Sequence, residues 1–280
     1  MTVIANAKLN LYLDITGRRE DGYHTLEMVM QSVSLSDVLE VEISDGSGIT
    51  LSCDAAHIPS DERNIAYKAA ERYLDIAGIE ASVDISIKKR IPSGAGMGGG
   101  SADAAAVLRA LDRRFGLVTE EKLHDIALSI GADVPFCLTG GTKICRGIGE
   151  DISECRAVEN CVFLVVMPDF TCPTAAAYKK YDDTPIASEN RLSEFVCSIS
   201  DGSFPERMHN TFEMLYNDSR IEDIKSVLTA SGARGAMLTG SGAAVFGVFD
   251  DEQTAAEASK RLPKFFTAVC TPVNEAVMIF

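Results

Sequence analysis

The chain reads Arg90-Ile91-Pro92-Ser93-Gly94-Ala95-Gly96-Met97-Gly98-Gly99-Gly100-Ser101-Ala102-Asp103-Ala104-Ala105-Ala106 at the point that decides its fold. Because glycine has no Cβ, five glycines between Gly94 and Gly100 let the backbone come close to a ligand. Ser101 is a suitable N-cap for a helix running to Phe115, and the free N–H groups at a helix start bind anions. The segment therefore predicts a phosphate-binding loop.

This loop has neither of two common nucleotide-binding spacings. It lacks the GxxxxGK[ST] pattern of a P-loop and a clean GxGxxG dinucleotide pattern. An alternating strand at Val83, Ile85 and Ile87 leads into the loop, and a helical pattern follows it. A purely structural turn needs only one or two glycines, so we favour a phosphate loop of another type.

Composition and charge limit the classes of partner. The 280 residues suffice for one long or two compact lobes, and we expect two. The net charge of −15 argues against nucleic acid or an anionic membrane as the main partner, because both attract basic surfaces. We see no secretory leader and no membrane-spanning apolar run, and we expect a cytoplasmic protein. The eight cysteines lack CxxC pairs, so we expect buried, reduced thiols rather than a zinc site.

Hydrophobic periodicity predicts strands and helices in mixed order. We expect half-buried strands at residues 9–14 and 38–43, and further strands at 83–87, 162–167, 244–250, 265–272 and 276–279. Expected helices span residues 62–77, 101–115, 119–131, 191–198, 204–216, 221–231 and 253–262. The absence of a regular βαβ rhythm favours an α+β fold. We place the domain boundary so that the two domains cover residues 1–155 and 156–280.

Three glycine-bearing clusters recur along the chain, at Gly94–Gly100, Gly131–Gly141 and Thr239–Ala244. Together with Ala7-Lys8-Leu9-Asn10, they resemble the galactokinase, homoserine kinase, mevalonate kinase and phosphomevalonate kinase superfamily, the GHMP kinases. The resemblance covers nearly the whole chain. It implies a two-lobed α+β fold with an N-terminal ATP-binding lobe, a C-terminal substrate lobe and a cleft between them. It also implies ATP and Mg²⁺ as cofactors.

Two segments narrow this resemblance, GRREDGYHTL at residues 17–26 and GADVPF at 131–136. They are similar to the branch that phosphorylates the 2-hydroxyl of 4-diphosphocytidyl-2-C-methyl-D-erythritol in non-mevalonate isoprenoid biosynthesis. The implied partner is a small cytidyl diphosphate, with no nucleic acid and no membrane, and we expect a monomer or weak homodimer. The alternatives are another GHMP kinase, acting on homoserine, mevalonate or a sugar, and a non-catalytic ligand sensor. Tyr23, His24 and Tyr178 favour an acceptor that carries a base.

Lys8 and Asp133 are the candidate catalytic residues. Phosphoryl transfer to an alcohol needs an oriented hydroxyl, a proton acceptor and positive groups around the phosphate. Asp133 lies between Gly131 and Val134-Pro135, which restrain the backbone, and we expect it to be the base; a plain turn aspartate is the alternative. Lys8 shares a strand face with Asn10, and a solvated edge lysine is its alternative. The resemblance implies that the pair acts together.

The resemblance implies binding roles for further residues. The phosphates of ATP would lie on the loop Pro92–Ala102, with Asn64 and Ile65 near the adenine. Tyr23 and Tyr178 would sandwich the cytosine while His24 bonds to its edge. The implied substrate-binding set is Asn10, Tyr23, His24, Thr174, Tyr178, Thr239, Gly240, Ser241 and Gly242. Asp103 suits the helix dipole but would repel a triphosphate, so it either points away or helps to hold magnesium; the metal ligands stay unassigned.

Overall fold

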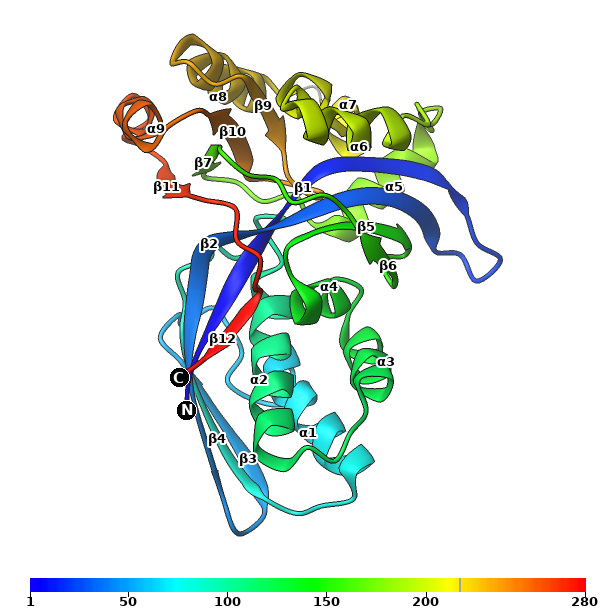
Figure 1. The fold of residues 1–280 in the computed structure, drawn as a ribbon, viewed down its shortest axis with the longest axis vertical. Helices are drawn as coiled ribbons and strands as arrows, with labels where there is room; N and C mark the ends of the chain where they lie inside the picture. The colour runs from blue at the N-terminus through cyan, green and yellow to red at the C-terminus, as the bar shows by residue number, and fades with distance from the viewer. Residues whose placement is uncertain (217) are drawn as a thin grey trace.

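The computed structural model describes residues 1–216 and 218–280, which form two lobes (Figure 1). Each lobe combines a β-sheet with helices packed against it, so the predicted α+β class is confirmed. Two long strands, β1 (Thr2–Arg18) and β2 (His24–Ser44), begin and end in different parts of the molecule and extend from one lobe beneath the helices of the other (Figure 1). The two lobes therefore share a continuous structural element.

The first sheet has the order β12-β1-β2-β4-β3, and β5, β6 and β8 attach beside this path. Its other strands are β3 (Gly48–Cys53), β4 (Ser82–Lys88), β5 (Thr142–Gly147), β6 (Asp151–Glu154), β8 (His209–Asn210) and β12 (Val277–Ile279). Most side chains of β1 are buried on both faces, so the prediction of a half-buried strand is wrong here. The reason is that helices of both lobes pack against β1, among them α2 (Gly99–Phe115) and α7 (Thr211–Leu215).

Four helices belong to this lobe: α1 (Ile65–Ala77), α2 (Gly99–Phe115), α3 (Glu120–Ile130) and α4 (Val134–Thr139). Local capping signals explain α1 and α3. The Asn64 side chain caps α1 and the left-handed Gly78 ends it, while Thr119 caps α3. These two predicted helices are confirmed, whereas the short α4 was not predicted.

The second sheet is antiparallel, with the order β11-β7-β10-β9. Its strands are β7 (Val162–Met167), β9 (Gly235–Leu238), β10 (Val245–Phe249) and β11 (Phe266–Cys270). The helices of this lobe are α5 (Thr174–Asp183), α6 (Leu192–Asp201), α7 (Thr211–Leu215), α8 (Ser219–Ala230) and α9 (Glu252–Ser259), with a 3₁₀ helix η1 (Phe204–Arg207). Helices α8 and α9 pack on the sheet.

The helix predicted over residues 204–216 is wrong. The segment forms η1, then β8, then the short helix α7. Strand β8 pairs in parallel with β1, with His209 opposite Tyr12. The Asn210 side chain donates hydrogen bonds to the carbonyls of Leu238 at 2.8 Å and Gly240 at 2.9 Å. These long-range hydrogen bonds hold the centre of the segment extended. Hydrophobic periodicity could not predict them, because it depends only on residues close in the sequence.

The boundary between residues 155 and 156 remains a proposal. Strands β8 and β12 follow that boundary in the sequence, yet both pair with β1 in the first sheet. The two chain ends consequently lie near one another (Figure 1). Within residues 1–216 and 218–280, no helix combines the length and apolar character needed to cross a membrane.

The eight cysteines are free, but they differ in burial. Cys137, Cys145, Cys161 and Cys270 are buried, whereas Cys197 is exposed. The prediction of buried thiols is therefore wrong for Cys197, which lies on the solvent side of α6.

Candidate active site

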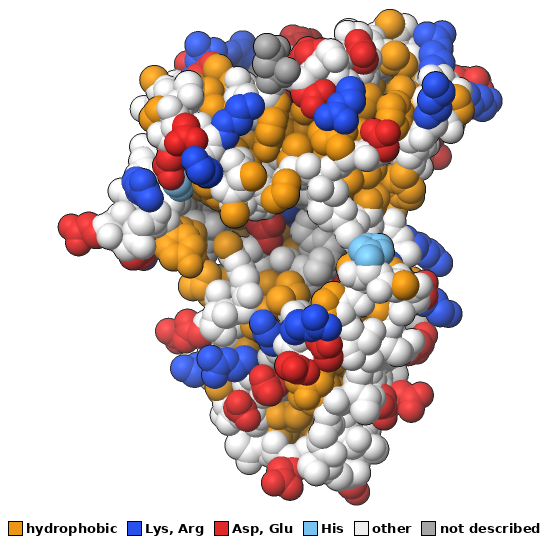
Figure 2. All heavy atoms as spheres, turned by 180° about the vertical axis from the view of Figure 1, so that it is seen from behind, with side chains coloured by type: hydrophobic (Ala, Val, Ile, Leu, Met, Phe, Trp, Pro, Cys, Tyr) orange, Lys and Arg blue, Asp and Glu red, His pale blue; other side chains and the backbone are white. Residues whose placement is uncertain are grey.

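A cavity of about 600 Å³ brings together side chains from both lobes. Seen from behind, the molecule is hollowed between the lobes (Figure 2). Strand β1 contributes Lys8 and Asn10 to the cavity, α4 begins beside it at Asp133, and α5 contributes Thr174 and Tyr178. The cavity therefore joins residues that lie far apart in the sequence.

Lys8 and Asp133 form an ion pair in this cavity, with 3.3 Å between Lys8 Nζ and Asp133 Oδ2. The Lys8 side chain is 5% exposed and the Asp133 side chain 31% exposed. Lys8 also donates a hydrogen bond of 2.7 Å to Asn10 Oδ1. Asp133 occupies the N-cap position of α4 without making a side-chain capping bond, so its carboxylate remains directed to Lys8 and the cavity.

The glycine loop lies directly against this ion pair. The Lys8 N–H donates to the Met97 carbonyl at 3.0 Å, which fixes the loop to β1. A Cβ added to Gly98 would lie 3.1 Å from Lys8 Cγ and 3.8 Å from Asp133 Oδ2. Gly98 also has a positive φ of 69°, a conformation that favours glycine. The close approach of loop and lysine therefore depends on the missing side chain.

The predicted N-cap at Ser101 is wrong. Helix α2 begins at Gly99, with the left-handed Gly98 at its N-cap and a hydrogen bond from the Ala102 N–H to the Gly98 carbonyl. Ser101 lies within the first turn of the helix and lines the cavity. Side-chain capping is absent at this end, so the loop backbone itself turns the chain into the helix.

The third glycine cluster packs against the first, backbone to backbone. A Cβ on Gly96 would lie 2.2 Å from the Thr239 carbonyl oxygen, and one on Gly240 would lie 2.9 Å from the Gly96 carbonyl oxygen. Thr239 is fully buried, and its hydroxyl accepts a hydrogen bond from the Asn10 N–H. Thr239 therefore supports the site from behind, whereas Gly240 and Ser241 line the cavity.

The predicted base-binding residues meet at the other end of the cavity. The rings of His24 and Tyr178 stack, with centroids 4.8 Å apart and planes 13° from parallel. His24 Nε2 lies 2.8 Å from Asp182 Oδ1. Tyr23 is 62% exposed, so the ring against Tyr178 is the imidazole of His24 rather than Tyr23. Burial raises the pKa of Tyr178 to about 12, which keeps its hydroxyl protonated.

A neighbouring cavity of about 490 Å³ is lined by the start of the glycine loop and by the third cluster. Ser93, Gly94 and Gly96 line it from the first lobe, and Gly242 lines it from the second. His57 also lines it and contacts the Ser93 hydroxyl at 3.0 Å. Asn64 and Ile65, predicted near the adenine, lie at the start of α1, outside the lining of both cavities described so far.

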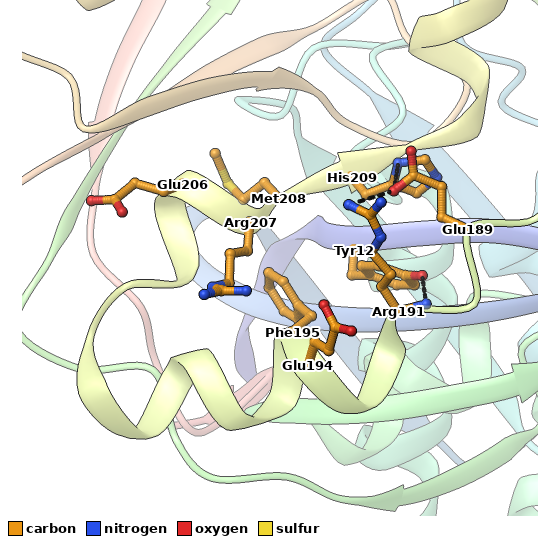
Figure 3. Close-up of a pocket in the computed structure, with 9 residues that line it drawn as sticks. All are labelled: Tyr12, Glu189, Arg191, Glu194, Phe195, Glu206, Arg207, Met208 and His209. Carbon is orange, nitrogen blue, oxygen red and sulfur yellow. Dashed lines mark hydrogen bonds and ion pairs between the residues drawn. The ribbon is translucent and has the colours of Figure 1, made fainter.

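A further cavity, of about 420 Å³, has a different character (Figure 3). Glu189, Arg191 and His209 point toward one another above Tyr12. Glu189 Oε2 lies 3.3 Å from a guanidinium nitrogen of Arg191 and 3.9 Å from His209 Nδ1. The Tyr12 hydroxyl accepts a hydrogen bond from the Arg191 N–H at 3.1 Å. Tyr12, Glu189, Arg191 and His209 thus pair with one another at one end of this cavity.

The buried carboxylate of Asp14 anchors that network. Burial alone would raise the pKa of Asp14, but the nearby His209 and hydrogen bonds from Ser188, the Asn190 N–H and Thr211 lower it well below its usual value. The Thr211 hydroxyl donates to Asp14 Oδ1 at 3.0 Å. We assign this cluster to the stability of the fold.

Sequence reasoning missed three residues of the site. Asp182 contacts His24, Asn210 holds the Gly240 carbonyl, and His57 contacts Ser93. Each partner is distant in the sequence, so no local spacing relates them. The residues that the structure describes contain no group of three or more His, Cys, Asp or Glu side chains arranged to hold a metal ion.

Two family models match the chain. The GHMP kinases N terminal domain matches residues 64–141, which include the glycine loop and Asp133. The GHMP kinases C terminal model matches residues 206–268, which include the third glycine cluster.

Individual proteins are similar over nearly the whole length. The 4-diphosphocytidyl-2-C-methyl-D-erythritol kinase of Clostridium perfringens is 42% identical over 264 residues, covering 92% of each chain. The protein of the same name from Clostridium botulinum is 39% identical over 257 residues, covering 90% of this chain and 91% of the relative.

Solved structures show the same fold. The crystal structure of a 4-(cytidine 5'-diphospho)-2C-methyl-D-erythritol kinase superimposes with a TM-score of 0.81 at 32% identity, covering 96% of this chain and 99% of that one. Homoserine kinase from Cytophaga hutchinsonii also has a TM-score of 0.81, but at 21% identity, covering 100% of this chain and 97% of that one. At that identity the likeness concerns the fold alone.

Proposed function

The chain belongs to the GHMP kinases, in the family of the 4-diphosphocytidyl-2-C-methyl-D-erythritol kinases, and we propose that it phosphorylates the 2-hydroxyl of that cytidyl substrate. ATP is the phosphoryl donor and ADP the second product. The reaction is a step in non-mevalonate isoprenoid biosynthesis. The observation that carries the mechanism is the 3.3 Å ion pair of Lys8 and Asp133 in a cavity that also holds His24 and Tyr178.

The Lys8–Asp133 pair supplies the groups that transfer to an alcohol requires. The Asp133 carboxylate orients the acceptor hydroxyl and takes its proton as the oxygen attacks the γ-phosphorus. Lys8 stabilises the charge on the phosphoryl oxygens and holds Asp133 in place. Its hydrogen bond to Asn10 restricts the ammonium to one direction, and Asn10 in turn donates to the Met28 sulfur at 3.4 Å.

The glycine loop is suited to hold the phosphates of the nucleotide. Gly94, Gly96 and Gly98 have positive φ angles, which turn successive peptide groups so that N–H groups converge on an anion. The N-terminus of α2 adds its free N–H groups and dipole at the end of the loop. Mg²⁺, as the proposed cofactor, would neutralise phosphate charge; few carboxylates are needed, because phosphate oxygens and water supply most of its ligands.

The aromatic end of the cavity is suited to bind the cytosine of the acceptor. Tyr23 and Tyr178 offer faces for stacking, and His24 offers a polar edge for hydrogen bonds. Arg18 and Lys179 also line the cavity and carry positive charge toward the acceptor diphosphate. We keep the sandwich of a base between Tyr23 and Tyr178 as part of the proposal. The His24 ring at present covers one face of the Tyr178 ring.

A panel of acceptors tests this function. We expect ADP release, measured by a coupled assay, with 4-diphosphocytidyl-2-C-methyl-D-erythritol and little release with homoserine, mevalonate or galactose. ³¹P NMR of the product should show a new phosphomonoester at the 2-position. Turnover of one of the other acceptors without turnover of the cytidyl substrate would contradict the proposal. Binding of both ligands without turnover would indicate a sensor.

We also propose that the enzyme works in the cytoplasm as a monomer or weak homodimer. The support is the net charge of −15, which disfavours anionic surfaces as its place of work. Light scattering after gel filtration measures the oligomeric state, and fractionation of source cells measures the location. A stable tetramer or recovery with the membrane fraction would contradict these statements.

A further inference from the structure

A second lysine–aspartate cluster lies beneath the glycine loop, and the proposed chemistry does not use it. Lys89 Nζ donates a hydrogen bond of 2.7 Å to Asp103 Oδ2 and another to Asp37 Oδ2. The side chains of Lys89, Asp37 and Asp103 are 8%, 0% and 5% exposed. Charges buried to this degree persist only when they are paired. We call these three side chains the loop bridge.

The loop bridge connects the two ends of the glycine loop. Asp37 Oδ1 accepts hydrogen bonds from the Arg90 N–H at 2.5 Å and the Ile91 N–H at 2.9 Å, where the chain enters the loop. Asp103 lies near the start of α2, where the loop ends. Lys89 joins the two carboxylates. One ammonium and two carboxylates therefore link the two ends of the loop.

The bridge also lies against the loop itself. A Cβ on Gly99 would lie 3.4 Å from Lys89 Nζ and 3.1 Å from Ile91 Cγ2. The adjacent Gly98 faces Lys8 and Asp133 instead. A shift of the bridge would therefore move the backbone that carries the N–H groups of the phosphate site.

One oxygen of the bridge has no hydrogen-bond partner among the described residues, Asp103 Oδ1. Burial, with the nearby Asp37 carboxylate, raises the pKa of Asp103 to about 7 against the opposing effect of Lys89. Burial alone would lower the pKa of Lys89, but Asp103 and Asp37 raise it, so the lysine stays charged. Near neutral pH the bridge thus gains or loses one proton at Asp103.

Other titratable groups face the bridge from the neighbouring elements. Cys53, at the end of β3, is close enough to affect the same charges, and its own pKa is raised by burial. Asp54 accepts a hydrogen bond from the Lys89 N–H at 2.9 Å. Cys137 on α4 is buried, and burial raises its pKa further above its usual value. The raised pKa of Asp103 lies in the neutral range, whereas the raised pKa values of the two thiols lie above it.

We propose that Asp103, Lys89 and Asp37 position the glycine loop for the nucleotide phosphates, and that Asp103 binds a proton when the anionic nucleotide arrives. Asp103 is a positioning residue that acts through the loop. The inference rests on the proposed function for the identity of the nucleotide. The Asp103–Lys89 hydrogen bond holds the loop in either protonation state, while the neutral state tolerates the phosphate charge better. Nucleotide affinity should therefore fall as pH rises through neutrality.

Two variants of Asp103 separate the hydrogen bond from the charge. Asp103→Ala removes both, and we expect the KM for ATP and the Kd for ADP to rise about tenfold, with kcat changed less than about threefold. Asp103→Asn keeps an acceptor for Lys89 without the charge. We expect its ADP affinity at pH 7 to stay within about threefold of the wild type.

The pH profile distinguishes positioning from mere stability. For the wild type we expect the Kd for ADP to rise about fivefold between pH 6 and pH 8.5, as one charge appears near the site. Asp103→Asn should lack this component. Asp125→Asn is the matched control, because Asp125 forms an exposed ion pair with Lys122 on α3. The pH profile of Asp125→Asn therefore includes the titration of ADP and Mg²⁺ binding themselves, which the comparison removes.

Calorimetric titration with ADP needs no acceptor, so this test is independent of the acceptor's identity. Failure of the wild type to bind ADP would contradict the proposed function. Normal ADP binding with identical pH profiles in Asp103→Asn and Asp125→Asn would overturn the proton-linked part. Unchanged ADP affinity in a folded Asp103→Ala protein would overturn the positioning role, even if its melting temperature fell. If Asp103→Ala does not fold, the Asp103→Asn protein tests the proposal instead. Its pH profile for ADP binding and the amide hydrogen exchange of residues 93–101 should then differ from those of the wild type, and no difference in either would overturn the proposal.

Discussion

The two lysine–aspartate clusters beside the glycine loop differ in what surrounds them. Lys8 and Asp133 face a cavity, and Asp133 keeps 31% of its side chain exposed. Lys89 joins two carboxylates, and its whole cluster is sealed under the loop. Gly98 faces the first cluster and Gly99 the second. The same residue types therefore lie open to a ligand in one cluster, for which we propose a role in catalysis, and are closed off by the protein in the other, for which we propose positioning of the loop.

Removal of the Asp133 carboxylate should have the largest effect on turnover. For Asp133→Asn we expect kcat to fall about 10³- to 10⁴-fold, because the amide orients the hydroxyl but takes no proton. The KM for ATP should change only a few-fold. Steady-state ADP release measures both constants. An Asp133→Asn enzyme with full turnover would refute the assignment of Asp133 as the base. Neither lysine–aspartate cluster would then have a carboxylate that takes part in the chemistry.

Removal of the Lys8 ammonium should have the second largest effect on turnover. For Lys8→Met, which keeps the aliphatic packing against Gly98, we expect kcat to fall about 10²- to 10³-fold, with a smaller effect on ADP binding. Lys122→Met on the exposed surface of α3 is the control and should retain normal kinetics. If ADP affinity fell as much as kcat, Lys8 would contribute to binding of the nucleotide before the reaction rather than to the transition state.

The buried cluster should appear in the pH dependence of stability. The pKa of Asp103 rises from 3.8 to about 7 on folding, so between these values the native state binds more protons than the unfolded state. The contribution of Asp103 to the free energy of unfolding should therefore fall as pH rises from 4 to 7, by about 2 to 4 kcal/mol. Urea unfolding of the wild type and Asp103→Asn at several pH values measures this contribution. Parallel curves for the two proteins would contradict it.

The smallest effect is expected from a methyl group between loop and lysine. Gly98→Ala would place a Cβ 3.1 Å from Lys8 Cγ, and we expect kcat to fall about tenfold as the ammonium shifts. Gly78→Ala has a similar positive φ but open space around it, at the end of α1. Each variant should lose about 1–2 kcal/mol of stability through the backbone conformation. A Gly78→Ala enzyme that loses as much turnover as Gly98→Ala would mean that the clash with Lys8 is irrelevant.

Local signals in the sequence predict part of the fold correctly. The helices predicted over residues 62–77 and 119–131 are present, and Thr119 and Gly78 mark their ends within one helical turn. The first of them begins three residues later than predicted, after the N-cap Asn64. The family patterns likewise led to the GHMP kinases, which both family models support. The predictions fail where contacts with distant segments determine the local backbone. Ser101 is not a cap because the loop, held by Lys8 and the third glycine cluster, enters the helix earlier.

The sequence by itself determined the glycine loop, the mixed strands and helices, and the residue types for transfer of phosphate to an alcohol, because these follow from backbone freedom, periodicity and side-chain chemistry. Only the tertiary structure decided that Asp103 pairs with Lys89 and Asp37, and that Thr239 supports the site from behind. The physical reason is that burial and pairing depend on neighbours that the fold brings from remote positions. An aspartate's sequence position carries no information about whether solvent or a lysine will face it.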